Sequence, residues 1–209
     1  MRLSRAVLAT LVVSSVVAVV ASVAEPRAHA LEPPPPAPWK PGPDVDGTLG
    51  MYAPLGRLQR VSSPAEWMRL TAGYELASWV GFFASFDAAF LSTDRANPPP
   101  GERGYVLWGF GGGARMGLPL GTRWRIPVRL EIGAHKVDDQ GVLATYGFSH
   151  GHSFGLSYGA MIGLEWRATS RHFGLALEGG LRNDAAVRDD AGTKPPFAVL
   201  AGIVIRYTL

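Results

Sequence analysis

The chain has 209 residues, 47% of them apolar, and it contains no cysteine, which excludes a disulfide-stabilised domain. Its formal charge is only +3, from 20 basic and 17 acidic side chains, and so small an excess does not indicate nucleic-acid binding. After Ala30 no apolar run reaches the length of a transmembrane helix.

The N-terminus has the pattern of a secretory signal peptide. Arg2 and Arg5 form a short basic region, an apolar run follows at residues 6–24, and Ala28-His29-Ala30 supplies the small residues of a cleavage site. We expect cleavage after Ala30, which lowers the formal charge to +1; the alternatives are cleavage after Ala24 and an uncleaved membrane anchor. The chain is therefore predicted to be exported.

Residues 31–46 follow as a second segment, which begins LEPPPPAPWKPGP. So many prolines are incompatible with a helix or a paired strand and favour an extended polyproline conformation. The predicted organisation is a signal peptide at 1–30, a proline-rich periplasmic tether at 31–46 and one domain at 47–209.

In the predicted domain every second residue is apolar, which is the period of a β-strand with two different faces. The segment at 124–135 is the clearest, because apolar and other residues alternate throughout it. Eight such segments follow one another along the chain: Gly47–Leu58, Trp67–Leu76, Gly81–Phe90, Trp108–Leu118, Trp124–His135, Ser153–Trp166, Phe173–Arg182 and Phe197–Leu209.

The fourth segment also contains Gly109-x-Gly111-x-x-Ala114, the spacing of a dinucleotide-binding turn. That motif needs a helix after its last position, and here Pro119 and the continued alternation exclude one. The face opposite the apolar residues consists mainly of glycine, alanine and serine with scattered charges. These side chains are too small to form a water-exposed surface. We therefore expect these glycines to line the lumen of a small barrel whose apolar face meets lipid.

The connections give a second, independent pattern, because short and long ones alternate, as in outer-membrane barrels. Residues 77–79, 119–123 and 167–171 are short, while 59–66, 92–103, 137–152 and 183–195 are longer. Each short connection has a tryptophan beside it, and these three residues predict an aromatic belt at the membrane interface: Trp79, Trp124 and Trp166.

The signal peptide, the alternating strands and the ending Ile203-x-Ile205-x-Tyr207-x-Leu209 resemble small outer-membrane barrels of the OmpA and OmpX type. The resemblance covers residues 47–209 and implies an all-β fold, an eight-stranded antiparallel up-and-down transmembrane barrel. Leu209 departs from the terminal aromatic residue that is usual in this group. More faintly, SFDAAFLSTDRANPPPGERGYVLWGFGGG and DDQGVLATYGF resemble barrel proteins of myxobacterial gliding machinery.

The alternation assigns a set of charged residues to the lumen. Buried charges must pair or stay hydrated, so we expect a structural ion-pair network that fills the lumen. Glu165 and Glu178 are an example of two carboxylates that could catalyse hydrolysis as a pair. The sequence does not determine whether they lie opposite each other, because it leaves the cross-strand register open. The predicted lumen residues are Arg69, Glu75, Asp87, Arg115, Arg125, Arg129, Glu131, Glu165, Glu178 and Arg206.

Other candidate sites are weaker. His150, His152 and Ser153 resemble part of a lipid A deacylase site, but adjacent strand residues such as His152 and Ser153 point to opposite faces and cannot easily bond each other. Acidic residues in two predicted loops lack the spacing of a calcium loop and are interpreted as solvated charges: Asp138, Asp139, Asp184, Asp189 and Asp190. The histidines occupy separate segments and do not form a zinc set: His135, His150, His152 and His172.

The sequence thus predicts no catalytic residues, no cofactor and no metal. It favours a noncatalytic outer-membrane anchor or scaffold that acts through its surface loops. Its expected partners are outer-membrane lipid, lipopolysaccharide and envelope or motility proteins. A lipid A-modifying enzyme and a small diffusion channel remain as alternatives, although barrels of this size usually have a lumen filled by side chains.

Overall fold

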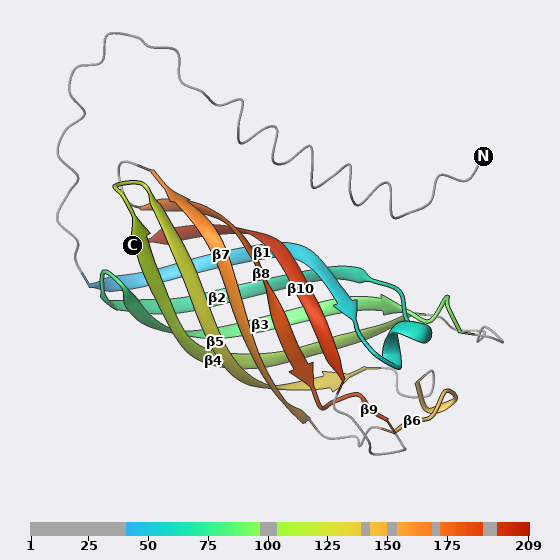
Figure 1. Cartoon of the computed structure of the whole chain (residues 1–209). Coiled ribbons are helices and arrows are strands. Elements are labelled where there is room, and N and C mark those ends of the chain that lie inside the picture. The colour runs from blue at the N-terminus through green and yellow to red at the C-terminus, as the bar shows by residue number, and fades with distance from the viewer. Residues whose placement is uncertain (1–40, 97–103, 139–142, 150–153, 169–171, 190–195) are drawn as a thin grey trace, which may run out of the picture. The chain divides into compact units, whose positions relative to one another are not determined.

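The computed structural model describes residues 41–96, 104–138, 143–149, 154–168, 172–189 and 196–209 (Figure 1). The predicted signal peptide and the tether up to residue 40 lie outside the described residues. Within the described ranges, no helix is long and apolar enough to span a membrane.

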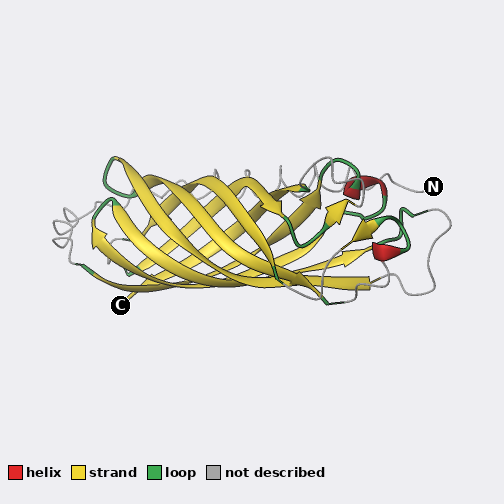
Figure 2. Ribbon diagram, turned by 90° about the horizontal axis from the view of Figure 1, so that it is seen from below, coloured by secondary structure: helices red, strands yellow, loops and turns green. Residues whose placement is uncertain are grey.

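Eight long antiparallel strands close into a barrel in the order β1-β10-β8-β7-β5-β4-β3-β2 (Figure 1). They wind obliquely around the barrel, as Figure 2 shows. This confirms the predicted all-β, eight-stranded fold. The strands are β1 (Gly42–Pro54), β2 (Ala65–Ala77), β3 (Val80–Ser92), β4 (Gly104–Leu120), β5 (Trp124–Val137), β7 (Gly155–Arg167), β8 (Phe173–Asp184) and β10 (Phe197–Thr208).

The predicted bounds of the first strand are wrong. β1 spans Gly42–Pro54 rather than 47–58, so the last residues of the predicted tether belong to the barrel. Leu58 belongs to the short helix η1 (Leu58–Arg60). The cause is that β1 points Asp44 and Asp46 into the barrel, where both are buried. Two acids beside a proline have the composition of a tether, although they alternate as strand residues do.

The connections differ between the two ends of the barrel. The turn end carries the short connections at 78–79, 121–123 and 168–172, and the loop end carries the four longer ones. The loop end also holds a small two-stranded sheet formed by β6 (Phe148–Ser149) and β9 (Arg188–Asp189). The predicted alternation of short and long connections is therefore confirmed.

The outer face of the barrel is apolar along all eight strands. On β10, for example, Phe197, Ile203 and Tyr207 are outward and exposed, while Arg206 between them is buried. From Phe197 to Tyr207 is ten residues, which at about 3.3 Å each and a tilt of roughly 40° spans about 25 Å. That height matches the apolar band of outer-membrane barrels.

An apolar cap covers the lumen at the loop end. Leu58 of η1, Leu143 and Phe148 of the β5–β7 connection, and Val187 before β9 pack on inward side chains of the barrel and are all buried. Tyr52, Trp67 and Tyr105 are among the barrel residues beneath them. We call this cluster the cap.

Candidate functional site

The inward glycines lie next to long polar side chains. A Cβ placed on Gly109 would lie 2.6 Å from the His135 ring, and one on Gly163 would lie 2.7 Å from Glu178 Cγ. Both pairs are cross-strand partners, Gly109 with His135 and Gly163 with Glu178. Gly109 of the dinucleotide-like motif thus leaves room for the His135 ring, and β5 rather than a helix follows β4, so no helix N-terminus is there to hold a phosphate.

Ion pairs fill the half of the lumen nearer the turn end. Arg129 lies 3.0 Å from Asp46 and 2.8 Å from Glu178, and Arg125 lies 2.5 Å from Glu165. We call this group the turn-side network. Its members are Asp44, Asp46, Glu75, Glu165, Glu178, Arg115, Arg125, Arg129, Arg167 and Arg206.

A second group lies between the turn-side network and the cap, and we call it the loop-side network. Asp87 accepts hydrogen bonds from Arg182 at 2.6 Å and from Arg69 at 3.0 Å. Arg69 also lies 2.7 Å from Glu131, and Arg182 lies 3.0 Å from Asp184. His135 completes the group, with Nε2 2.8 Å from Asp87 Oδ1.

The cap rests on the loop-side network. Tyr52 donates a hydrogen bond of 2.8 Å to Asp184, and the guanidinium of Arg182 lies 5.7 Å from the centre of its ring. The guanidinium of Arg69 lies 4.8 Å from the centre of the Trp67 ring. Two aromatic residues therefore connect the charges below to the apolar layer above.

All ten predicted lumen residues point into the barrel and take part in one or the other network. Sequence reasoning missed six further charged members: Asp44, Asp46, His135, Arg167, Arg182 and Asp184. Arg182 and His135 were on the predicted inward face but were not assigned to the network. Asp44 and Asp46 were missed because the first strand was placed too late. Arg167 had been assigned to a turn.

Asp184 requires a correction, because the sequence interpretation made it a solvated loop charge. β8 continues to Asp184, which is fully buried and ion-paired with Arg182. The signal was available, since positions 178, 182 and 184 keep the inward parity. Asp138 is exposed, while Asp139 and Asp190 lie outside the described residues.

Ser157 joins two residues of the loop-side network, His135 and Asp87, in the order of a catalytic triad. Ser157 Oγ lies 2.6 Å from His135 Nδ1, and Asp87 lies on the opposite ring nitrogen. A nucleophile must, however, reach its substrate, and all three residues are at most 3% exposed beneath the cap. The arrangement is a buried hydrogen-bonded chain rather than an accessible active site.

The described residues do not form the paired-carboxylate site or the metal site that the sequence raised as candidates. Glu165 and Glu178 both face the lumen, but Arg206 bonds the first at 2.6 Å and lies 3.8 Å from the second, so both are engaged as its partners. Among the described residues, no group of three or more potential ligands could hold a metal ion. His150, His152 and Ser153 lie outside the described residues.

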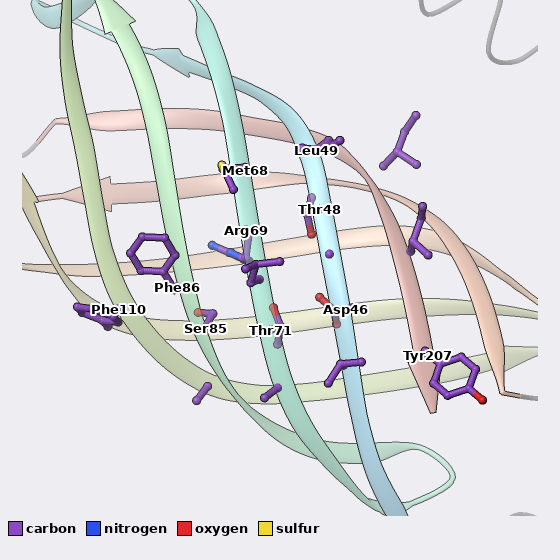
Figure 3. Close-up of a pocket in the computed structure, with 17 residues that line it drawn as sticks. Asp46, Thr48, Leu49, Met68, Arg69, Thr71, Ser85, Phe86, Phe110 and Tyr207 are labelled. Carbon is purple, nitrogen blue, oxygen red and sulfur yellow. The ribbon is translucent and has the colours of Figure 1, made fainter. Parts of the chain in front are cut away.

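An open groove runs over the outer face of the barrel, from β10 across β1, β2 and β3 to β4 (Figure 3). The small residues Gly47, Ala72 and Ala84 lie between larger side chains such as Leu49, Phe86 and Tyr207. The groove belongs to the apolar outer surface, and acyl chains are the natural contact of such a surface.

Aromatic residues of the outer face lie near both ends of the barrel. At the turn end Trp79 is exposed, and Trp124 pairs across strands with Trp166, so the three predicted belt residues lie near one another in height. Near the loop end Trp108 lies 5.4 Å, centre to centre, from Phe154. Sequence reasoning missed this second set, because phenylalanine rather than tryptophan dominates it.

A scan of protein-family models and a search of curated proteins found no match to the chain. Among solved structures, Neisserial surface protein A (NspA) is 15% identical, with a TM-score of 0.54 over 82% of this chain and 100% of that one. The Yersinia pestis outer membrane protein Ail is also 15% identical, with a TM-score of 0.44 over 79% and 99% of the two chains. The outer membrane enzyme PagL is 13% identical, with a TM-score of 0.39 over 79% and 99%.

At these identities the likeness extends to the fold and not to the activity. The match to NspA agrees with the closed barrel of eight long strands in this chain. The chain has the fold of the small outer-membrane β-barrels.

Proposed function

We propose that this chain is a noncatalytic anchor of the outer membrane, in which the loops bind and the barrel serves as a rigid support. The observation that carries the proposal is the filled lumen: two ion-pair networks occupy it, and the cap covers it at the loop end. A barrel built in this way offers its loops rather than its interior to other molecules.

Residues 1–30 would direct export and be removed, and residues 31–40 would connect the turn end to the periplasm. With the turn end on that side, the loop end faces the outside of the cell. Its expected partners are lipopolysaccharide and envelope proteins, including those of a motility complex. Exposed arginines at this end, Arg60 and Arg95, suit the phosphates of lipopolysaccharide.

The enzyme alternative has one specific observation in its favour, the chain Ser157–His135–Asp87. It needs the cap to open far enough to admit an acyl substrate. Loss of a deacylase activity in Ser157→Ala, measured on purified lipopolysaccharide, would favour the enzyme over the anchor.

Loop replacement tests the anchor directly. Replacing residues 97–103 or 190–195 by short Gly-Ser turns should leave the barrel folded, as judged by heat-modifiable gel migration, but abolish crosslinking to lipopolysaccharide or envelope proteins in intact cells. The matched control replaces residues 121–123 at the turn end and should retain crosslinking. If every replacement retained it, the loops would not be the binding elements.

A further inference from the structure

We propose that a phosphorylated glycolipid of the outer leaflet, the lipid A part of lipopolysaccharide, binds at one fixed place on this barrel. Its phosphates lie on Arg60 and Arg95 at the loop end, and one of its acyl chains lies in the groove that crosses β1, β2 and β3 below them. The site deepens the proposed function and rests on it for one point, that the loop end faces the outside of the cell.

The two arginines are brought together because two connections of the loop end are hydrogen-bonded to each other. Arg60 ends η1 in the β1–β2 connection, Arg95 follows β3, and both are exposed. The Arg95 guanidinium donates a hydrogen bond of 3.3 Å to the backbone oxygen of Gln59, the residue before Arg60. The Ser63 hydroxyl donates one of 2.6 Å to Asp94. Two neighbouring guanidinium groups suit a phosphate, because each can donate two parallel hydrogen bonds to its oxygens.

Charge is divided unevenly among the four connections of the loop end. By sequence, the β1–β2 and β3–β4 connections, residues 55–64 and 93–103, contain four basic and two acidic residues. The β5–β7 and β8–β10 connections, residues 138–154 and 185–196, contain two basic and four acidic residues, with histidine counted as neutral. A headgroup with several negative charges is therefore attracted to the side of the barrel that carries Arg60 and Arg95.

The groove on the same side of the barrel has small residues between large ones. Ala72 and Ala84 are cross-strand partners on β2 and β3, and both are exposed on the outer face. Phe86 and Phe110 lie together on one side, with ring centres 5.4 Å apart, and Tyr207 lies on the other side (Figure 3). An acyl chain that lies over the two alanines is flanked by these larger side chains, which increases the number of its van der Waals contacts.

The height between the arginines and the groove suits one acyl chain. Glu66, an exposed acid on the outer face of β2, marks the level at which hydrocarbon ends on this side, because an ionised carboxylate is costly within it. From Phe86 in the groove to Ser92 at the loop end of β3 is six residues, or about 15 Å of height at about 3.3 Å each and a tilt of roughly 40°. Half of a hydrocarbon core of about 30 Å has the same depth. A chain whose headgroup lies on Arg95 therefore reaches the groove.

Native mass spectrometry of the barrel in detergent micelles tests the headgroup contacts, with purified bisphosphorylated lipid A as the probe. We expect one lipid A molecule to stay bound to each wild-type barrel. Arg60→Ala/Arg95→Ala should lower the affinity roughly tenfold or more, as hydrogen bonds between charged groups are lost. The matched control is Lys136→Gln, which removes a cation near the loop end of β5, outside the groove, and should bind like the wild type. Equal affinities in the wild type and the double variant would overturn the proposal.

Photo-crosslinking locates the acyl chain, with a lipid A that carries a diazirine at the end of one chain as the probe. Most crosslinked peptides should come from β1, β2 and β3. Ala84→Phe, which fills the groove, should reduce this labelling. Ala160→Phe, at an exposed position on the outer face of β7, is the matched control and should leave it unchanged. Even labelling of all eight strands would show that the lipid has no fixed place and would refute the site.

The outcomes separate this site from the anchor role of the loops. If the double variant kept its lipid A affinity while Gly-Ser replacement of residues 190–195 abolished crosslinking to envelope proteins, the lipid site would be wrong and the anchor role would stand. If the double variant lost lipid A while every loop replacement kept that crosslinking, the site would stand and the anchor role would fail. Barrel dimers that replaced the lipid A adduct and were lost in Ala84→Phe would assign the groove to a second copy of this chain and overturn the proposal.

Discussion

Inside the barrel, large and small residues occur as cross-strand partners. Gly109 lies opposite His135 and Gly163 opposite Glu178, so the long side chain occupies the space that its partner leaves. This accounts for inward glycines such as Gly109 and Gly163, which lie in strands beside long polar side chains. It also means that a single added methyl group or a single lost charge should affect stability strongly.

Replacing Arg129 with leucine should leave Asp46 and Glu178 without this partner inside the turn-side network. Breaking a buried pair in this way costs about 3 to 5 kcal/mol, or less where water reaches the site. Denaturant unfolding in detergent micelles measures the loss, and Arg60→Leu, at an exposed position of η1, is the control. Equal midpoints for the two variants would show that Arg129 has no structural role.

Replacing Gly163 with alanine should strain the contact between β7 and β8, because the new Cβ would meet the Leu177 carbonyl and Glu178. Overpacking of this kind costs about 1 to 3 kcal/mol. Gly47→Ala is the control, because the nearest atom to its new Cβ is 4.0 Å away on the outer face. We expect that variant to unfold like the wild type or slightly later, and a reversed order would disprove the packing argument.

At the scale of the element, the bounds of a strand could be predicted where its two faces differ clearly in residue type. β5 alternates isoleucine, valine and leucine with arginine and glutamate, and its predicted start at Trp124 was correct. β1 has Asp44 and Asp46 on one face and only Val45 and Gly47 nearby on the other, so its contrast is weak. The pairing of Arg115 with these two acids depends on register, which alternation alone does not determine.

The connection between β5 and β7 contributes Leu143 and Phe148 to the cap. Replacing Phe148 with alanine should remove a buried ring and destabilise the cap by about 3 to 5 kcal/mol. Hydrogen exchange should then become faster at Leu143 and Phe148 itself but not at mid-barrel amides of β5. Phe90→Ala, on the outer face, is the control and should leave exchange in the cap unchanged; a uniform increase would mean that the cap is not a separate unit.

At the scale of the whole molecule, the two ends of the lumen are closed by different kinds of contact, apolar packing at one end and ion pairs at the other. The loop end has an apolar cap, while at the turn end Arg167 bonds Glu75 at 2.8 Å and Glu165 at 3.2 Å. The sequence predicted a filled lumen from strand number and charge. The cap was not predictable, because its residues come from loops that have no periodicity.

The filled lumen predicts that the barrel does not conduct. Purified protein in planar bilayers should show no steady conductance, and Arg167→Ala should remain closed because Arg125 with Glu165 and Arg115 with Asp44 lie deeper. Large, stable current steps from the wild type would revive the channel hypothesis. Steps from Arg167→Ala alone would mean that this arginine is the principal barrier.

The seam between β1 and β10 has a consequence for how the protein is made. The first strand of the barrel pairs with the last, from Asp44 with Thr208 to Pro54 with Ala198. Until β10 is available, β1 and β8 each have one edge of unpaired amide groups, which hydrocarbon does not tolerate. A chain that stops before residue 197 is therefore an open sheet and not a smaller barrel. Ribosomes make the closing strand after the other seven, so the cell must keep those seven from inserting or aggregating until β10 has been made.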